Sequence, residues 1–165
     1  MTSAMATAAE QYLAIVRSQL LAEGFSLLPS PAPDIFVAYR RQFELHVMST
    51  CHRFAVITYR PQMARPEFDA FCDQAFDYCQ VVRGGSWLGR VLFRSANIYA
   101  VAVVDSASWD LIQDANDGRS LRAAGVLRKV VRDLSAGRTY SLAGTPVAGW
   151  AFASFNRESI GRLFG

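Results

Sequence analysis

The stretch that decides the fold begins Asp34-Ile-Phe-Val-Ala-Tyr-Arg40 and ends Ala55-Val-Ile-Thr-Tyr-Arg60. It holds three runs rich in Val, Ile, Phe, Tyr and Thr, separated by short polar breaks, which is typical of an antiparallel meander. Alternate residues of a strand face opposite sides of the sheet, and here both sides are largely apolar. Strands with one face in water show a cleaner polar side. We therefore expect a helix, a partner subunit or a ligand to cover the second face.

The segments around 34–60 are predicted to cover this sheet. A helix over about 7–23 ends at Gly24, where glycine can adopt the left-handed stop conformation, and a stronger helical stripe runs from Phe68 to Val82. Strands are predicted at 25–28, 87–93, 98–104, 140–142 and 147–155, and a short helix at 107–117. Because strands group together in the sequence, the predicted fold class is α+β. It is an antiparallel sheet of about five to six strands, with the central meander 34–60, covered by an N-terminal helix, an amphipathic helix near 66–82 and a helix near 120–135.

Length and composition indicate one globular domain. The chain has 165 residues, of which 52% are hydrophobic and 19% charged, and this is enough to bury a core without a metal or a disulfide. No apolar run approaches the ~20 residues that a membrane-spanning helix needs. The first ten residues have neither the basic start nor the apolar block of a signal peptide. We expect a single domain over 1–165, no membrane association and a cytoplasmic location.

The net charge of +3 raises the question of nucleic-acid binding. All basic residues except Lys129 are arginines, and they are scattered along the chain rather than clustered. A nucleic-acid footprint needs a basic patch. A solvated, mixed surface is therefore the expectation, and nucleic acid is not an expected partner.

Two of the predicted helices carry charges of opposite sign. The helix near 66–82 has Asp69, Asp73 and Asp77 at successive i+4 positions, and the helix near 120–135 has a basic face. Exposed ion pairs contribute only ~0–1 kcal/mol each. Three arrangements stay open: pairing within the chain, pairing across a symmetric dimer, or two faces in water.

The cysteines and glycines form no recognisable catalytic or metal motif. Cys51, Cys72 and Cys79 contain no CxxC pair, and two of them lie on the apolar stripe of the helix near 66–82, where a free cysteine acts as a small hydrophobe. Structural zinc sites bring their ligands in close pairs. The glycines of 84–89 follow a helix and precede a strand, the reverse of the order in a phosphate-binding loop. We expect no metal and no cofactor.

One acidic pattern suggests chemistry. Asp34 follows a proline, and Glu44-x-His46 lies on the next run. This pattern resembles the Pro-Asp…(Asp/Glu)-x-Lys signature of restriction-endonuclease-like nucleases, with His46 in place of lysine. The resemblance implies a metal-dependent nuclease or phosphodiesterase in which Asp34, Glu44 and His46 surround a divalent metal that activates water. A hairpin turning near Arg41 would not place Asp34 directly opposite Glu44, and solvated polar residues at strand ends are the alternative interpretation.

The apolar second face of the sheet gives the first functional hypothesis. If no helix covers this face, we expect it to be a subunit interface or a ligand pocket. The residues that would line the pocket are Tyr39, His46, Met48, Tyr59 and Trp87. The order of elements is similar to that of small chaperone-like dimers of bacterial secretion systems, which are usually acidic. We expect a non-enzymatic binding module, homodimeric, that holds a small apolar ligand or a protein partner. The metal-dependent phosphodiesterase is the alternative.

Overall fold

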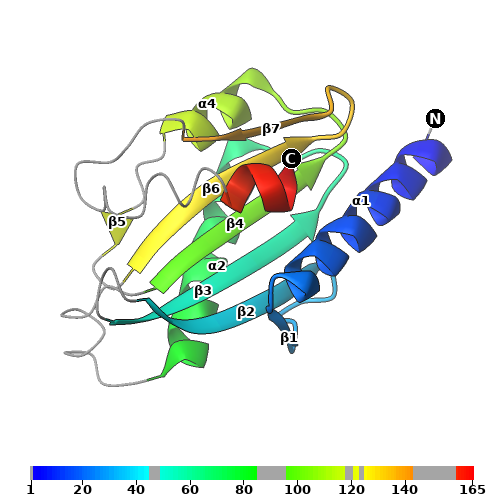
Figure 1. Ribbon diagram of the computed structural model, residues 1–165. Coiled ribbons are helices and arrows are strands. Elements are labelled where there is room, and N and C mark those ends of the chain that lie inside the picture. The colour runs from blue at the N-terminus through cyan, green and yellow to red at the C-terminus, as the bar shows by residue number, and fades with distance from the viewer. Residues whose placement is uncertain (1, 45–48, 85–95, 118–120, 123–124, 143–158) are drawn as a thin grey trace.

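The computed structural model describes residues 2–44, 49–84, 96–117, 121–122, 125–142 and 159–165. They form one sheet with helices on both of its faces (Figure 1). The helices are α1 (Thr2–Ala22), α2 (Arg65–Arg83), α4 (Trp109–Asp117) and a short helix at residues 159–164. None of the described helices is long and apolar enough to cross a membrane.

The sheet is mixed rather than purely antiparallel, which corrects the prediction. Its strands are β1 (Ser26–Leu28), β2 (Ile35–Glu44), β3 (Ser49–Tyr59), β4 (Ala96–Val104), β5 (Leu121–Arg122), β6 (Gly125–Asp133) and β7 (Arg138–Ser141). They lie in the order β1-β2-β3-β4-β6-β5, with β7 also paired to β6. β1, β2 and β3 are antiparallel, whereas β3, β4 and β6 are parallel neighbours. Parallel strands need a crossover connection, and here α2 and α4 lie in the two crossovers.

The central stretch forms two long strands where three shorter runs were predicted. β2 and β3 pair from Ile35 opposite Thr58 to Glu44 opposite Ser49, so the first polar break of the meander lies inside β2. Residues 45–48 lie outside the described residues, as does the predicted strand at 87–93. The predicted strand at 98–104 corresponds to β4, and its described partners are β3 and β6.

The prediction of a helix near 120–135 is wrong, because this segment contains the strands β5 and β6. In β6 alternate side chains enter opposite cores, Leu127 and Val131 on one face and Val130 on the other. A strand buried on both faces loses the apolar–polar alternation that identifies strands in a sequence. The sequence of this segment therefore predicted a helix with one apolar side.

The end predicted for the first helix at Gly24 is confirmed. Gly24 ends the first helix with a φ of 82°, the left-handed conformation predicted for it, and the amide of Phe25 bonds back to the carbonyl of Leu20 at 3.0 Å. At the start of α2, the side chain of Glu67 accepts a hydrogen bond from the amide of Ala64 at 2.9 Å, which satisfies an amide that no helical carbonyl can reach.

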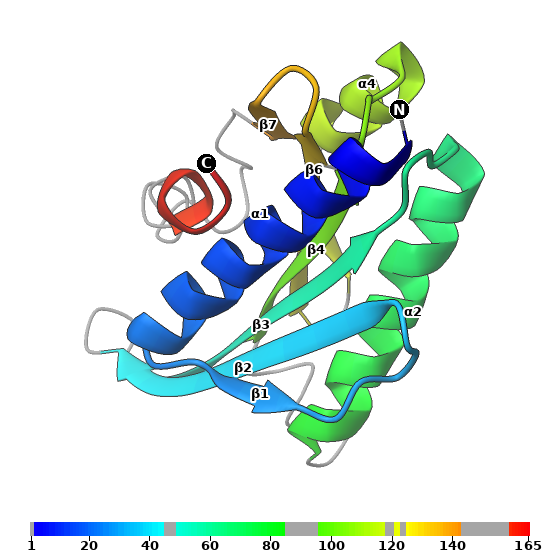
Figure 2. The same cartoon turned by 90° about the vertical axis from the view of Figure 1, so that its right-hand side faces the viewer.

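The two faces of the sheet are covered by different helices. Figure 2 shows α1 on one side of the strands and α2 on the other. The buried residues of α2 and α4 pack with Phe54 and Val56 of β3 in one core cluster. Those of α1 and of the helix at 159–164 pack with Ile57 and Tyr99 in a second cluster. Both faces of the 34–60 hairpin are thus covered within the chain, and this removes the argument for a ligand or a second subunit against an open apolar face.

Candidate functional site

The ends of three parallel strands frame an open groove. The residues that follow these strands are 61–64 after β3, 105–108 after β4 and Ser135 after β6. Together with Met5 of α1 they line a hollow of about 1050 Å³. Sheets with parallel strands bind ligands at the carboxyl ends of those strands. The volume is comparable with the ~300–1000 Å³ of known ligand pockets. We call this hollow the carboxyl-edge groove.

Asp133, at the end of β6, holds the walls of the groove in place. Its carboxylate accepts hydrogen bonds from the amide of Ala107 at 2.9 Å and from the amide of Ala136 and the hydroxyl of Ser135, both at 2.8 Å. Burial by itself would raise the pKa of Asp133, but these hydrogen bonds outweigh it and hold the pKa below its ordinary value. The carboxylate is therefore charged at neutral pH and fixes two loops at once.

Backbone hydrogen bonds tie the loops to one another as well. The amide of Arg60 donates to the carbonyl of Val103 at 3.0 Å, and that of Asp105 donates to the carbonyl of Pro61 at 3.1 Å. On the other side of β4, the amide of Ser135 donates to the carbonyl of Asp105 at 2.9 Å. The pairing of the strands thus continues past their ends, and the groove is preformed rather than built from loose loops.

Asp105 supplies the negative charge of the groove. The hydroxyl of Tyr59 donates to Oδ1 of Asp105 at 2.9 Å. The pKa of Tyr59 is raised by burial first, and then by the hydrogen bond to Asp105 and the charge on it. Within the described part of the chain, Oδ2 of Asp105 has no hydrogen-bond partner. A ligand in the groove would therefore meet a carboxylate oxygen that can accept a hydrogen bond.

Asp34 lies at the same edge of the sheet but is neutralised. Its carboxylate pairs with the guanidinium of Arg60 at 3.1 Å, and the hydroxyl of Thr58 donates to its backbone carbonyl at 3.0 Å. From the facing strand β3 and the residue that follows it, the side chains that contact Asp34 are those of Thr58 and Arg60, and neither is a carboxylate. One carboxylate already paired with arginine is a poor ligand for a divalent cation.

Two of the predicted catalytic residues, Asp34 and Glu44, do not come together. Asp34 directly precedes β2 and Glu44 ends it, and ten residues along an extended strand span about 33 Å. His46 lies outside the described residues. No cluster of three or more potential metal ligands occurs in the described ranges.

The predicted ligand pocket is also divided. Tyr39 belongs to the cluster under α2, where its hydroxyl contacts Nδ1 of His52 at 2.9 Å. Tyr59 packs on the opposite face of the sheet, at its other end. Met48 and Trp87, like His46, lie outside the described residues. Tyr59 is connected to the carboxyl-edge groove by its hydrogen bond to Asp105, which lines it.

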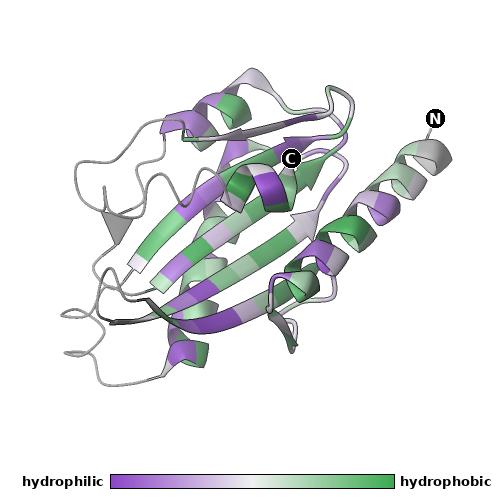
Figure 3. Ribbon diagram, viewed as in Figure 1, coloured by the Kyte–Doolittle hydropathy of each residue, from purple (hydrophilic) through white to green (hydrophobic). Residues whose placement is uncertain are grey.

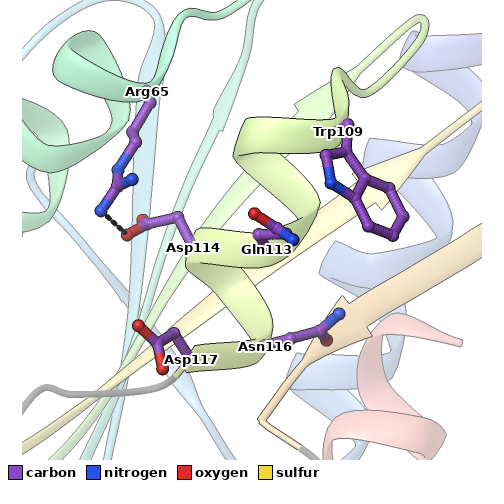
Figure 4. Close-up of a pocket in the computed structure, with 6 residues that line it drawn as sticks. All are labelled: Arg65, Trp109, Gln113, Asp114, Asn116 and Asp117. Carbon is purple, nitrogen blue, oxygen red and sulfur yellow. Dashed lines mark ion pairs between the residues drawn. The ribbon is translucent and has the colours of Figure 1, made fainter.

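A second hollow, of about 560 Å³, lies against the exposed side of α4 (Figure 4). Its lining side chains spread over the outer surface of the helix rather than converging, apart from Arg65 and Asp114, which point toward each other at 3.5 Å. Trp109 is 70% exposed at the start of α4. This open depression has no group poised for chemistry, and we do not assign it a function.

Beneath that depression, Lys129 of β6 joins both crossover helices to the sheet. Its ammonium donates to Asp69 of α2 at 2.6 Å and to Asp114 of α4 at 2.7 Å. Burial would lower the pKa of Lys129, but the hydrogen bonds to Asp114 and Asp69 outweigh it and the pKa is raised. A lysine held charged between two carboxylates is not a base or a nucleophile, so its role is structural. Of the three arrangements left open for the acidic stripe of the helix near 66–82, the structure shows pairing within the chain for Asp69.

Sequence reasoning missed the groove residues, although a signal for them exists. Asp105 and Ser106 directly follow the apolar run that becomes β4, and Pro61 and Gln62 follow the run that becomes β3. Polar residues after two strands meet at one edge only if the strands are parallel. Predicting those strands as antiparallel hid the site.

No protein-family model matches the sequence, and no significant match was found among curated proteins or among solved structures. The functional argument therefore rests on the geometry of this chain.

Proposed function

We propose that the protein is a non-enzymatic module that binds a small amphipathic ligand in the carboxyl-edge groove. The apolar part of the ligand would lie against Met5, Pro61 and Met63, and an amine or another hydrogen-bond donor would face Asp105. The single observation that carries this proposal is the preformed groove with one charged acceptor in its wall. Pockets of this kind combine an apolar lining with few polar groups that set the orientation of the ligand.

The side chains around the groove favour binding over catalysis. The groove contains the serines Ser106, Ser108 and Ser135, and a serine nucleophile needs a base within hydrogen-bond reach. His52 is in the amino-terminal half of β3, seven residues before the end of the strand. The hydroxyl of Ser108 already accepts a hydrogen bond from the amide of Leu111 at 3.3 Å, at the start of α4. The serines are therefore suited to bind a polar group rather than to attack one.

The alternative hypothesis, a metal-dependent phosphodiesterase, gains no support from this arrangement. It needs at least two carboxylates around one metal. Asp34 and Glu44 stand at opposite ends of β2, and Arg60 already neutralises Asp34.

Three probes with the same alkyl chain test the binding proposal: octylammonium, octanol and octanoate. We expect octylammonium to raise the Tm of the protein by about 3–5 °C at ten times its Kd, octanol to act more weakly, and octanoate to have no effect because Asp105 repels it. Asp105→Asn should remove the preference for octylammonium over octanol. Thermal unfolding followed by circular dichroism measures all three.

A groove-filling variant and its control complete the test. Ser106→Trp places a large side chain in the groove and should abolish the effect of octylammonium, whereas Ser18→Trp, on the exposed side of α1, should leave it unchanged. Equal shifts for all three probes, or a shift that survives Ser106→Trp, would refute the proposed site.

A further inference from the structure

The outer edge of β2 is only partly paired. β1 lies beside Val37, Ala38 and Tyr39 of this strand, and Figure 2 shows β1 as a short strand alongside the long β2. Among the described residues, no strand pairs with β2 on that side beyond Tyr39, although β2 continues to Glu44. We call residues 40–44 of β2 the open edge. An unpaired strand edge is a template on which another chain can add a strand.

The open edge carries an exposed aromatic side chain among polar ones. Arg41 and Gln42 are exposed, and Phe43 is 55% exposed and belongs to neither core cluster. Figure 3 shows a hydrophilic segment in this half of β2. Because Tyr39 packs in the core under α2, strand alternation places Arg41 and Phe43 on that same side of the sheet. Strand edges in water are normally short, charged or covered, so an exposed phenyl ring here favours a partner chain.

The limits of the open edge fix how two copies of the chain can pair along it. Tyr39, which β1 already covers, limits the edge on one side, and the end of β2 at Glu44 limits it on the other. Two strands related by a two-fold axis run antiparallel, and each contact occurs twice. Pairing over the whole edge is therefore centred on its middle residue, Gln42. Arg41 would then stand opposite Phe43 of the second copy, and the arginine that begins the edge would stand opposite the glutamate that ends it.

We propose that the protein forms a symmetric dimer in which two open edges pair as antiparallel strands centred on Gln42. In this register a guanidinium meets an aromatic ring twice, which is an attractive arrangement, and no like charges stand opposite each other. An axis shifted to Arg41 would set two arginines face to face, which destabilises a sheet. The charge pattern of the edge is thus complementary to its own reversed copy. The edge is short, so we expect a dimer that dissociates reversibly. The interface is independent of the carboxyl-edge groove, because Glu44 pairs with Ser49 at the start of β3 and the groove follows the end of β3.

Cross-linking at the centre of the open edge tests this register. Directly opposite residues of antiparallel strands have Cα atoms about 4.5–5.5 Å apart, which lies within the range that a disulfide spans. Gln42→Cys should therefore give a disulfide-linked dimer under mild oxidation, whereas Gln11→Cys, on the exposed side of α1, should not. The three native cysteines are buried, so the wild type should stay unlinked. Non-reducing gel electrophoresis measures the product. Equal cross-linking of the two variants, or none for Gln42→Cys, would overturn the proposal.

Two substitutions of Phe43 separate strand pairing from a general apolar contact. Phe43→Lys sets a second positive charge opposite Arg41 at both symmetric positions and should weaken the dimer about tenfold or more. Phe43→Glu sets a carboxylate opposite Arg41 instead and should keep the dimer. Sedimentation velocity at protein concentrations up to about 1 mM measures both dissociation constants against that of the wild type. A wild type that stays monomeric throughout, or an equal loss of the dimer in both variants, would overturn the proposal.

Discussion

His52 is held in its neutral form by its surroundings. Burial lowers its pKa from 6.5, and the positive charges of Arg83 and Arg41 lower it further. Its Nδ1 lies 2.9 Å from the hydroxyl of Tyr39. A histidine whose pKa is lower in the folded than in the unfolded state stabilises the fold above its unfolded pKa. That contribution disappears as the pH falls through the folded pKa.

We therefore expect acidification from about pH 7 to pH 5 to lower the Tm of the wild type more than that of His52→Asn. Asparagine cannot be protonated in this range, and its side-chain amide can form a hydrogen bond to the hydroxyl of Tyr39 in place of Nδ1. An NMR titration of the His52 ring supplies the direct measurement. A titration midpoint above 6.5 would contradict the expected direction of the shift.

At the scale of secondary-structure elements, the spacing of apolar residues decides what a sequence can predict. The prediction of a helix near 66–82 is confirmed by α2. Phe68 and Phe71 are three residues apart and enter the same core cluster. An odd spacing puts two side chains on one side of a helix but on opposite sides of a strand, so the sequence itself distinguished the two structures. In β6, Leu127 and Val131 share a face as well, but a spacing of four is even and fits both structures. The pairing of β6 with β4 decides between them, and a single segment does not contain that information.

Lys129 should contribute most of its stability through Asp114. Lys129 and Asp114 have side chains that are 11% and 7% exposed, and Asp69 is 47% exposed. Lys129→Met leaves a buried carboxylate without its closest partner, and we expect it to lower the free energy of unfolding by about 3 kcal/mol. Asp69→Asn, which removes the exposed pair, should cost less than about 1 kcal/mol.

Urea unfolding of both variants measures these free energies. Lys129→Met combined with Asp114→Leu removes both buried charges together and should recover most of the loss. Equal costs for Lys129→Met and Asp69→Asn would show instead that burial does not set the strength of this cluster.

At the scale of the whole molecule, the candidate site depends on topology. Asp34 and Tyr59 were predicted in two different sites, and the structure brings both to the carboxyl edge of the sheet. Neither placement follows from local patterns, since the edge exists only because β3, β4 and β6 are parallel. The predicted homodimer stays a prediction. It rested on an uncovered apolar face, and both faces of the hairpin are covered by helices of the chain.

The covered sheet also predicts how the chain unfolds. Four strands, β2, β3, β4 and β6, contribute residues to both core clusters. Loss of either cluster would therefore expose one apolar face of these same strands to water. We therefore expect one cooperative transition, as for a single domain over residues 1–165. Buried thiols report on the two faces separately, because Cys51 projects toward the α1 side of β3 by strand alternation and Cys72 lies in α2 under the other face.

Two single-cysteine variants make the test, one with Cys51 as its only cysteine and one with Cys72 as its only cysteine. A thiol reagent should label Cys51 and Cys72 only on unfolding, because both are buried. Labelling should share one urea midpoint with the loss of circular dichroism. Two separated midpoints would divide the chain into independent units. Because dissociation couples unfolding to concentration, a midpoint that rises with protein concentration would support the predicted homodimer, and a constant midpoint would show that each chain folds alone.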